Sequence, residues 1–249
     1  MTKKVKIYTP TYYRYEKTRR AIDSIVESIE QSKNEVTLYI GDNDTKGPQM
    51  REWLKQLAQH PQVKVFFSDK NLGKGAMINQ MHEKTGDDAD YFISIDSDML
   101  SDEHDQYNWI DELVKIMEHG PAKNFGLLSV YQKENNAHVL KEQKERTEFL
   151  GHHIMYGTFW GIAGGCVIMR NQDFIDIGRY NLVDVYSGDD ALLMRNVTNK
   201  MKKLVGITED IRLVHQANEE YEKDYQQWKI DKCHGKIKCD TKGKGFWDD

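Results

Sequence analysis

Two aspartates separated by a single residue stand at the end of an apolar segment. Asp96 and Asp98 follow the run Tyr91 to Ile95, which is typical of a buried strand. Because side chains alternate along a strand, both carboxylates are expected to face the same crevice. Their oxygens suit a hard divalent cation, and the small Ser97 leaves room for a diphosphate to share it. The pattern predicts a Mg2+ or Mn2+ site, although a polar loop that caps a following helix produces the same triplet.

A third ligand for this cation has to come from another part of the chain. His215 directly follows the apolar residues Ile211 to Val214, and a neutral imidazole complements carboxylate oxygens in metal sites. The alternative is a histidine that is satisfied by a backbone group. Asp96, Asp98 and His215 are thus the predicted metal ligands.

A second pair of acidic residues, Asp189 and Asp190, precedes a helix-like segment. Either carboxylate can cap that helix and interact favourably with its dipole, with Gly188 giving the turn its freedom. The other, if it projects into the crevice, can act as a general base that removes a proton from a hydroxyl group. Both aspartates are therefore catalytic candidates, and the sequence alone does not choose between them.

The first hundred residues alternate between strand-like and helix-like segments. The predicted strands are Val5 to Tyr8, Val36 to Ile40, Val63 to Phe67 and Tyr91 to Ile95, and the predicted helices cover residues 21–29, residues 50–58 and the segment opened by residues 71–75. This rhythm predicts an α/β fold with a mostly parallel central sheet. Ligands of such sheets bind beyond the carboxyl ends of the strands, so the polar clusters at 9–14, 42–44 and 96–98 are expected to converge on one crevice.

The pattern changes after residue 100. Helices are predicted at Trp109 to Met117 and Asp189 to Lys200, and strands at Phe125 to Tyr131, Ile162 to Met169 and Ile211 to Val214. The charged stretch Gln132 to Glu148 is compatible with a loop or with an exposed helix.

Composition narrows the class of protein. The 249 residues carry 35 basic and 40 acidic side chains, a formal charge of -5, so no global positive field is available to hold nucleic acid. The three cysteines, Cys166, Cys233 and Cys239, are odd in number and poorly spaced for disulfides or zinc, which favours a reducing compartment. With no signal-like or membrane-spanning apolar run, we expect a cytoplasmic protein.

Several motifs, in order, resemble those of the family 2 glycosyltransferases and their GT-A relatives across residues 4–215. The matching segments are Thr9-Pro10-Thr11-Tyr12-Tyr13-Arg14 at the first strand end, Gly41-Asp42-Asn43-Asp44 at the second, Asn71-Leu72-Gly73-Lys74-Gly75-Ala76 with Asn79, Asp96-Ser97-Asp98 at the metal motif, Gly161 to Arg170, and Gly188-Asp189-Asp190 through Leu192 and Arg195. The last block departs from the family's Glu-Asp-x-Asp-Leu-x-x-Arg pattern, with Gly188 for the glutamate and Ala191 for the second aspartate. Counting back from Arg195 places the family's catalytic aspartate on Asp189.

The resemblance implies a GT-A, Rossmann-like fold and the metal-dependent transfer of a sugar from a nucleotide-sugar, most of all a UDP-sugar, to an acceptor hydroxyl. The implied nucleotide-sugar site comprises Thr9, Pro10, Thr11, Tyr13, Asp42, Asn71, Gly73, Lys74, Asp96, Ser97, Gly164 and Gly165. The two adjacent glycines would let the backbone approach the donor sugar closely, or would form a bulge. The metal would act as the Lewis acid for the diphosphate leaving group. Residues 159–190 are also similar to enzymes that retain the anomeric configuration, so the stereochemistry stays open.

Acceptor recognition is the least specific part of the prediction. The aromatic and polar residues His153, Tyr156 and Trp160 suit stacking on sugar rings, or they pack as a loop against the sheet. We expect residues 1–228 to form the catalytic domain and residues 229–249 a lysine-rich tail. The acceptor is then a saccharide or a surface-glycan precursor, or hydroxymethylated cytosine in phage-type DNA held by the basic tail.

Two other classes of protein share parts of this pattern. Sugar-phosphate nucleotidyltransferases also hold a nucleotide on a parallel sheet, but they carry a glycine-rich basic loop after the first strand, where this chain has residues 9–13. A binding module without catalysis would have no need of Asp96, Asp98, Asp189 and Asp190. The sequence pattern therefore favours sugar transfer over both alternatives.

Overall fold

The computed structural model describes residues 1–85, 88–101, 107–119, 124–132, 145–157, 164–181 and 189–216. All of them belong to Met1–Gln216, the first of the two units into which the chain divides; the second is Ala217–Asp249. The lysine-rich tail and the domain boundary predicted at residue 228 lie outside the described residues.

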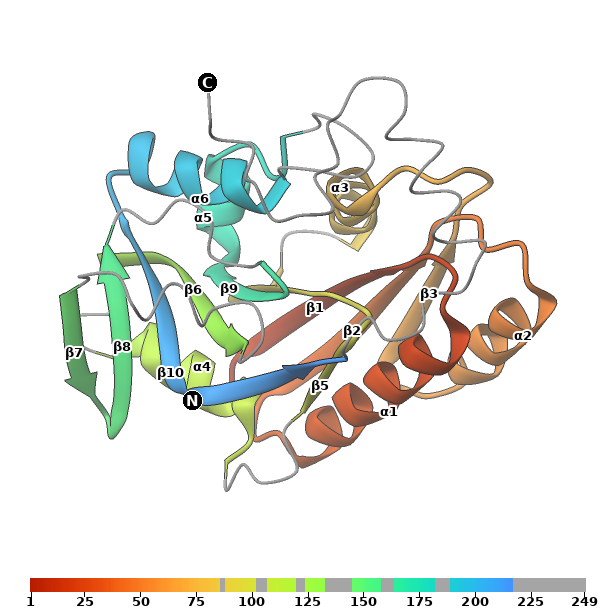
Figure 1. Ribbon diagram of the computed structural model, residues 1–249, viewed down its shortest axis with the longest axis horizontal. Helices are drawn as coiled ribbons and strands as arrows, with labels where there is room; N and C mark the ends of the chain where they lie inside the picture. Colours follow the sequence, from red (N-terminus) through yellow and green to blue (C-terminus); the bar gives the residue numbers. More distant parts are fainter. Residues whose placement is uncertain are drawn as a thin grey trace. The chain divides into compact units, whose positions relative to one another are not determined.

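The described part of the chain contains ten strands and six helices (Figure 1). The strands are β1 (Lys4–Thr11), β2 (Glu35–Asp42), β3 (Val63–Phe67), β4 (Tyr91–Ile95), β5 (Met99–Ser101), β6 (Phe125–Gln132), β7 (Glu145–Phe149), β8 (His152–Gly157), β9 (Cys166–Arg170) and β10 (Leu204–His215). The helices are α1 (Tyr15–Gln31), α2 (Pro48–Leu57), α3 (Lys74–Thr85), α4 (Trp109–Glu118), α5 (Asn171–Asp176) and α6 (Asp189–Asn199).

These strands form one sheet in the order β3-β2-β1-β4-β9-β6-β10-β8-β7, with β5 paired to β10. The first four strands are all parallel, which confirms the predicted parallel core. Strand β9 then runs antiparallel between β4 and β6, and β10 is parallel to β6 but antiparallel to β8. The sheet therefore joins a parallel half to a mixed half.

Helices cover both faces of the sheet because its strands are apolar on both sides. On β1, Val5 and Ile7 pack in one cluster with residues of α1, α2 and α4, whereas Tyr8 packs in another with residues of α3, α5 and α6. Figure 1 shows α1 and α2 on one side of β1 and α3 on the other. This three-layer arrangement leaves the carboxyl ends of the parallel strands open for polar groups.

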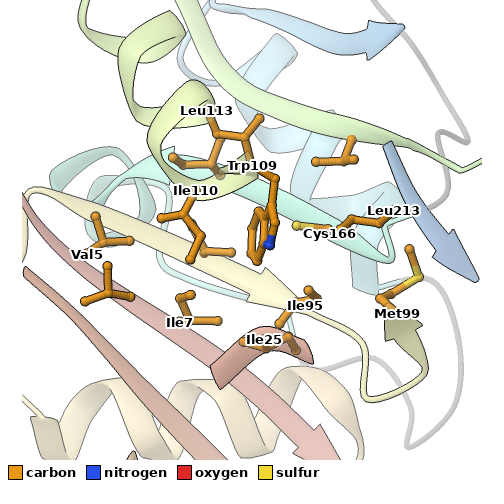
Figure 2. Packing of buried hydrophobic residues seen from close by; sticks show 14 of the residues in the cluster. Val5, Ile7, Ile25, Ile95, Met99, Trp109, Ile110, Leu113, Cys166 and Leu213 are labelled. Carbon is orange, nitrogen blue, oxygen red and sulfur yellow. The ribbon is translucent and has the colours of Figure 1, made fainter. Parts of the chain in front are cut away.

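Trp109 anchors α4 in the first of these clusters (Figure 2). Its side chain is buried among residues that include Ile95 and Cys166, and its indole N–H donates a hydrogen bond of 3.0 Å to the hydroxyl of Ser28 on α1. One large side chain thus fixes α4 against both the sheet and α1. Cys166 is buried and carries a free thiol.

The structure corrects the prediction for three segments. Of the stretch Gln132 to Glu148, predicted as a loop or exposed helix, Gln132 ends β6, residues 133–144 lie outside the described residues, and the last four belong to β7. β7 pairs antiparallel with β8, whose residues 152–157 the sequence predicts as part of an aromatic loop. The short strand predicted at 211–214 is the end of the 12-residue β10, which is interrupted by a register shift between Thr208 and Arg212. Their local patterns are too polar or irregular to reveal strands, because these strands are defined by pairing with distant partners.

Gly41 on β2 lies directly under α3, and the contact leaves no room for a side chain. A Cβ atom there would come within 2.4 Å of Cγ of the buried Met77. We predict that Gly41→Val lowers the free energy of unfolding by about 1–3 kcal/mol through overpacking, measured by chemical denaturation. Gly47→Ser is the control, because a Cβ at Gly47 meets nothing within 4 Å and serine suits the start of α2. Equal stability of the two variants would contradict this packing.

Candidate functional site

The polar residues at the ends of β1, β2 and β4 meet at one edge of the sheet, where the sequence predicts a crevice, as the parallel order requires. The N–H of Asn43, after β2, donates to the carbonyl of Thr11 at the end of β1. Arg14, just beyond β1, donates a hydrogen bond to Asp98, just beyond β4. Three segments that are distant in the sequence therefore line one site.

The ammonium group of Lys74, at the start of α3, lies at the centre of this site. It is 2.8 Å from a carboxylate oxygen of Asp96 and 3.0 Å from one of Asp190, which stands on α6. It also donates a hydrogen bond of 3.0 Å to the carbonyl of Gly164, in the turn before β9. Lys74, predicted as a donor-binding residue, thus connects three separate parts of the fold.

These groups alter one another's protonation. Burial opposes the charge on Lys74, but the carboxylates of Asp190 and Asp96 outweigh it and raise the lysine pKa well above its usual value. Burial raises the pKa of Asp96 to about 6, against the opposing effect of Lys74. The lysine therefore keeps its charge between the two carboxylates.

Asp98 is paired differently from Asp96. Its Oδ2 atom is 2.7 Å from a guanidinium nitrogen of Arg14 and 3.5 Å from Nε2 of His215. Burial acts to raise the pKa of Asp98, but the hydrogen bonds and charges of His215 and Arg14 hold it well below the usual range. In return, the hydrogen bond to Asp98 raises the pKa of His215. Asp98 is therefore a buried carboxylate that stays ionised.

The donor set at this point fits a divalent cation in part. Within the described ranges, no three His, Cys, Asp or Glu side chains are already arranged around a metal position. Asp98 and His215 lie together as predicted, whereas Asp96 pairs with Lys74. However, the buried Oδ1 atom of Asp98 has no hydrogen-bond partner among the described residues. An ionised carboxylate with an unused oxygen beside an imidazole is a donor set that Mg2+ or Mn2+ accepts.

The two aspartates at the start of α6 have different surroundings. Asp189 is buried, and its Oδ2 atom accepts a hydrogen bond of 3.0 Å from the N–H of Gly75 in the first turn of α3. Asp190 pairs with Lys74, and 27% of its side chain is exposed. Asp189 thus caps a neighbouring helix, while Asp190 is the one of the two that borders the crevice with accessible surface.

The paired glycines before β9 permit a very close approach of side chains to the backbone. A Cβ atom at Gly164 would lie 2.0 Å from Cγ of Asp190, and one at Gly165 would lie 2.2 Å from the side-chain nitrogen of Gln132. The carbonyl of Gly165 also accepts a hydrogen bond of 2.7 Å from the N–H of Asp96. The space beside each glycine is therefore filled by a side chain of the protein, Asp190 beside Gly164 and Gln132 beside Gly165.

The ends of β1 and β2 contain a group of buried polar atoms. Asp42 is fully buried, and burial raises its pKa. Its Oδ1 atom accepts from the N–H of Thr45, while Oδ2 lies 3.8 Å from Nε of Arg51 and accepts no hydrogen bond from the described residues. The hydroxyls of Thr9 and Thr11 likewise lack partners in this part of the structure. Such unsatisfied groups indicate a ligand position.

The loop before α3 is held to the end of β2. The side chain of Asn43 accepts a hydrogen bond from the N–H of Leu72, and Asn71 accepts one from the N–H of Gly73, which has a φ of +81°. This network places Lys74 at the crevice. Sequence reasoning proposed Asn71, Gly73 and Lys74 but did not single out Asn43, although it belongs to the acidic turn.

The remaining donor-site predictions fall around the same crevice. Pro10 lies between the two threonines of β1, and Ser97 is buried between the two aspartates. Tyr13 follows β1 with a φ of 55°, packs edge-on against Tyr12 with ring centroids 4.6 Å apart, and its N–H donates to the hydroxyl of Thr45. Their roles toward a ligand stay predictions.

The predicted acceptor residues are placed on another part of the sheet. His153 and Tyr156 stand on β8, which is separated from β4 by β9, β6 and β10. His153 pairs with Asp210 on β10, and Tyr156 packs edge-on against Phe125. Trp160 lies outside the described residues. The structure thus places both described side chains among neighbours of their own sheet edge.

Sequence reasoning did not assign roles to two arginines that contact site carboxylates. Arg14 pairs with Asp98, and Arg51 lies beside Asp42 while its guanidinium stacks 5.2 Å from the ring centre of Phe67. Arg14 was visible as the last residue of the motif at the end of the first strand. No local pattern identifies Arg51, because it stands on the amphipathic helix α2.

The parallel sheet with polar side chains at its carboxyl ends defines an α/β protein of the kind that binds a ligand at that edge. Residues 6–178 match the family described as Glycosyl transferase family 2. Because this match covers more than half of the chain, the protein belongs to glycosyl transferase family 2, a family of glycosyltransferase enzymes. Comparison with curated protein sequences gives no match.

Solved structures with similar folds are GT-A glycosyltransferases. A mannosyltransferase from Pyrobaculum calidifontis in complex with GDP-Man and Mn2+ has a TM-score of 0.67 and 14% identity, over 92% of this chain and 61% of that one. GalNAc-T7 with UDP, GalNAc and Mn2+ has a TM-score of 0.65 and 11% identity, over 86% of this chain and 44% of that one. TarS from S. aureus (residues 1–349) has a TM-score of 0.60 and 13% identity, over 86% of this chain and 60% of that one. The chain thus covers less than two thirds of each. At these identities the likeness establishes the GT-A fold.

No helix within the described residues combines the length and the apolar character that a membrane-spanning helix requires.

The position of Lys74 between two carboxylates makes it a structural residue. We predict that Lys74→Met lowers the free energy of unfolding by on the order of 2 kcal/mol, because Asp96 and Asp190 would then repel each other in a partly dry site. Lys70→Met, at an exposed lysine of the preceding loop, is the control and should change little. In the Lys74→Met background, Asp190→Asn should restore part of the loss. Failure of that rescue would show that the carboxylates do not depend on the lysine charge.

Proposed function

We propose that this enzyme transfers a sugar from a nucleoside diphosphate sugar, most of all a UDP-sugar, to a hydroxyl group of an acceptor. The observation that carries the proposal is the ionised, buried Asp98, whose Oδ1 atom has no described partner, at the same sheet edge as the unsatisfied Oδ2 of Asp42. The first group suits a cation that accompanies a diphosphate, and the second suits a donor group of a nucleoside.

The nucleoside would lie at the ends of β1 and β2. Asp42 offers a carboxylate oxygen, and Thr9 and Thr11 offer hydroxyls that have no described partners. The N–H group of a nucleobase, or a ribose hydroxyl, would satisfy these acceptors. Tyr13 and Asn71 stand next to this position and would complete it. Lys74, which keeps its charge between Asp96 and Asp190, would lie beside the donor.

The diphosphate would lie near Asp96 and Asp98. Asp98 and His215 would hold Mn2+ or Mg2+, and Asp96 would join them if it exchanged Lys74 for the cation. Such a cation stabilises the negative charge that develops on the leaving diphosphate. Cation complexes of two similar structures, with GDP-Man in one and with UDP in the other, support this arrangement.

Asp190 is the better candidate for the general base, and Asp189 for a positioning residue. Asp190 has accessible surface at the crevice, whereas Asp189 is buried and caps α3. In an inverting transfer, the acceptor oxygen bonds to the anomeric carbon while the bond from that carbon to the diphosphate oxygen breaks. The hydroxyl proton passes to the carboxylate, and the nucleoside diphosphate departs.

The proposed acceptor is a hydroxyl group of a saccharide or of a surface-glycan precursor. A saccharide or surface-glycan hydroxyl requires no strong positive field, which agrees with the net charge of -5. Modified DNA would need the basic tail at residues 229–249, which lies outside the described residues. The free, buried thiol of Cys166 is compatible with the proposed cytoplasmic site of action.

Donor binding can be measured without knowledge of the acceptor. We predict that one nucleoside diphosphate among UDP, GDP, CDP and dTDP raises thermal stability in the presence of Mn2+, since a ligand at about 100 times its dissociation constant adds about 2.7 kcal/mol. In Asp98→Asn the Mn2+-dependent part of this rise should vanish, because the ionised oxygens are lost. A full rise in that variant would remove the cation from Asp98, and no rise with any nucleotide would contradict the proposed function.

The two aspartates of α6 are separated by a matched pair of substitutions. Asp190→Asn should lower kcat by about 10²–10⁴-fold with little change in donor affinity, as expected for loss of a general base. Asp189→Asn should keep most activity, because its amide oxygen can still accept from Gly75. The assay follows nucleoside diphosphate release from the donor with a panel of saccharide acceptors. The reverse ranking would make Asp189 the base, and full activity in both variants would exclude a general base at this position.

A further inference from the structure

The side chain of Arg14 contacts Asp98 of the site and does not cap the helix that follows it. It is the residue immediately before α1, but its side chain makes no capping hydrogen bond to that helix. Instead its guanidinium reaches Asp98, at a distance of 2.7 Å, with 14% of the arginine side chain and 7% of the aspartate side chain exposed. A nearly dry ion pair of this kind is strongly coupled, because the loss of one partner leaves the other charge buried.

The backbone at this point is unfavourable for an arginine. Tyr13 and Arg14 both adopt left-handed conformations, with φ values of 55° and 54°. Non-glycine residues enter this region at a cost of about 1–2 kcal/mol each. Asparagine or glycine would adopt it more easily. The ion pair with Asp98 accounts for an arginine at this position.

The same carboxylate is the proposed ligand of the divalent cation. Arg14 and His215 both lie against Oδ2 of Asp98, while Oδ1 is unpartnered among the described residues. A guanidinium and a divalent cation on one small carboxylate would repel each other strongly in a site of low dielectric constant. A cation bound at Oδ1 would therefore weaken the contact between Arg14 and Oδ2 of Asp98.

We propose that Arg14 is a positioning residue with two partners. In the cation-free enzyme its guanidinium neutralises Asp98, and when the cation binds, the guanidinium leaves Asp98 and contacts the diphosphate of the donor. The inference rests on the proposed function, since it assumes a cation at Asp98 and a diphosphate beside it. A guanidinium released from a carboxylate has a planar donor array that matches two phosphate oxygens. The arginine would thus link cation binding to donor binding.

The proposal predicts effects of opposite sign in one variant. In Arg14→Gln, Mn2+ should bind the nucleotide-free protein about tenfold more tightly or better, because the competing charge is gone. In the presence of saturating Mn2+, the same variant should bind the nucleoside diphosphate selected above about tenfold more weakly, because a phosphate partner is gone. Mn2+ affinity is measured by electron paramagnetic resonance of the free ion, and nucleotide affinity by titration calorimetry.

Three further variants complete the experiment. Arg19→Gln removes a positive charge from the exposed side of α1, where Arg19 pairs with Asp23, and should change neither affinity. Arg14→Lys retains a charge and should fall between the wild type and Arg14→Gln, and it serves if the glutamine variant does not fold. Asp98→Asn tests the underlying assumption, since it should lose Mn2+ binding altogether.

The outcomes separate the proposed exchange from the cation assignment on which it rests. Tighter Mn2+ binding with weaker nucleotide binding in Arg14→Gln, set against unchanged Arg19→Gln, supports the exchange. Unchanged or weaker Mn2+ binding in both Arg14 variants overturns it, even if Asp98→Asn shows that Asp98 binds the cation. Unaltered Mn2+ binding in Asp98→Asn would instead overturn the cation assignment of the proposed function.

Discussion

The interaction on which the site depends is the contact of the Lys74 ammonium with the carboxylates of Asp96 and Asp190. These residues come from the start of α3, the end of β4 and the start of α6, and the last is 116 positions from the lysine. The lysine also holds the carbonyl of Gly164 before β9. A charge withdrawn from water is stable only with such partners, so this group fixes the relative positions of elements that the sheet alone would leave adjustable.

The same principle governs the rest of the crevice. Asp98 is neutralised by Arg14, and Asp42 lies beside Arg51, while each aspartate keeps one oxygen without a described hydrogen-bond partner. The protein therefore balances its buried negative charge before any ligand arrives. In the proposed function, a cation or a nucleotide would exchange partners with these groups, which costs less than creating an unpaired buried charge would.

Close packing gives the two aspartates at the start of α6 different neighbours. Gly75 allows Asp189 to reach the backbone of α3, and Gly164 allows Asp190 to lie against the turn before β9, where any side chain would collide with it. One carboxylate thereby joins two helices, and its neighbour is held at the crevice with part of its surface accessible. Adjacent residues of the same type acquire different roles because their surroundings differ.

The sequence by itself determined the parallel half of the fold and the identity of its polar ends, because apolar alternation, helical periodicity and turn residues act over a few positions. β3 and β4 have the predicted bounds, and of the three predicted metal ligands Asp98 and His215 lie together, whereas Asp96 pairs with Lys74. Only the tertiary structure decided that Arg14 pairs with Asp98, 84 positions away, and that residues 145–157 form strands. Ion pairs and edge strands are defined by partners distant in the chain, and a local pattern carries no record of which partner the fold will bring near.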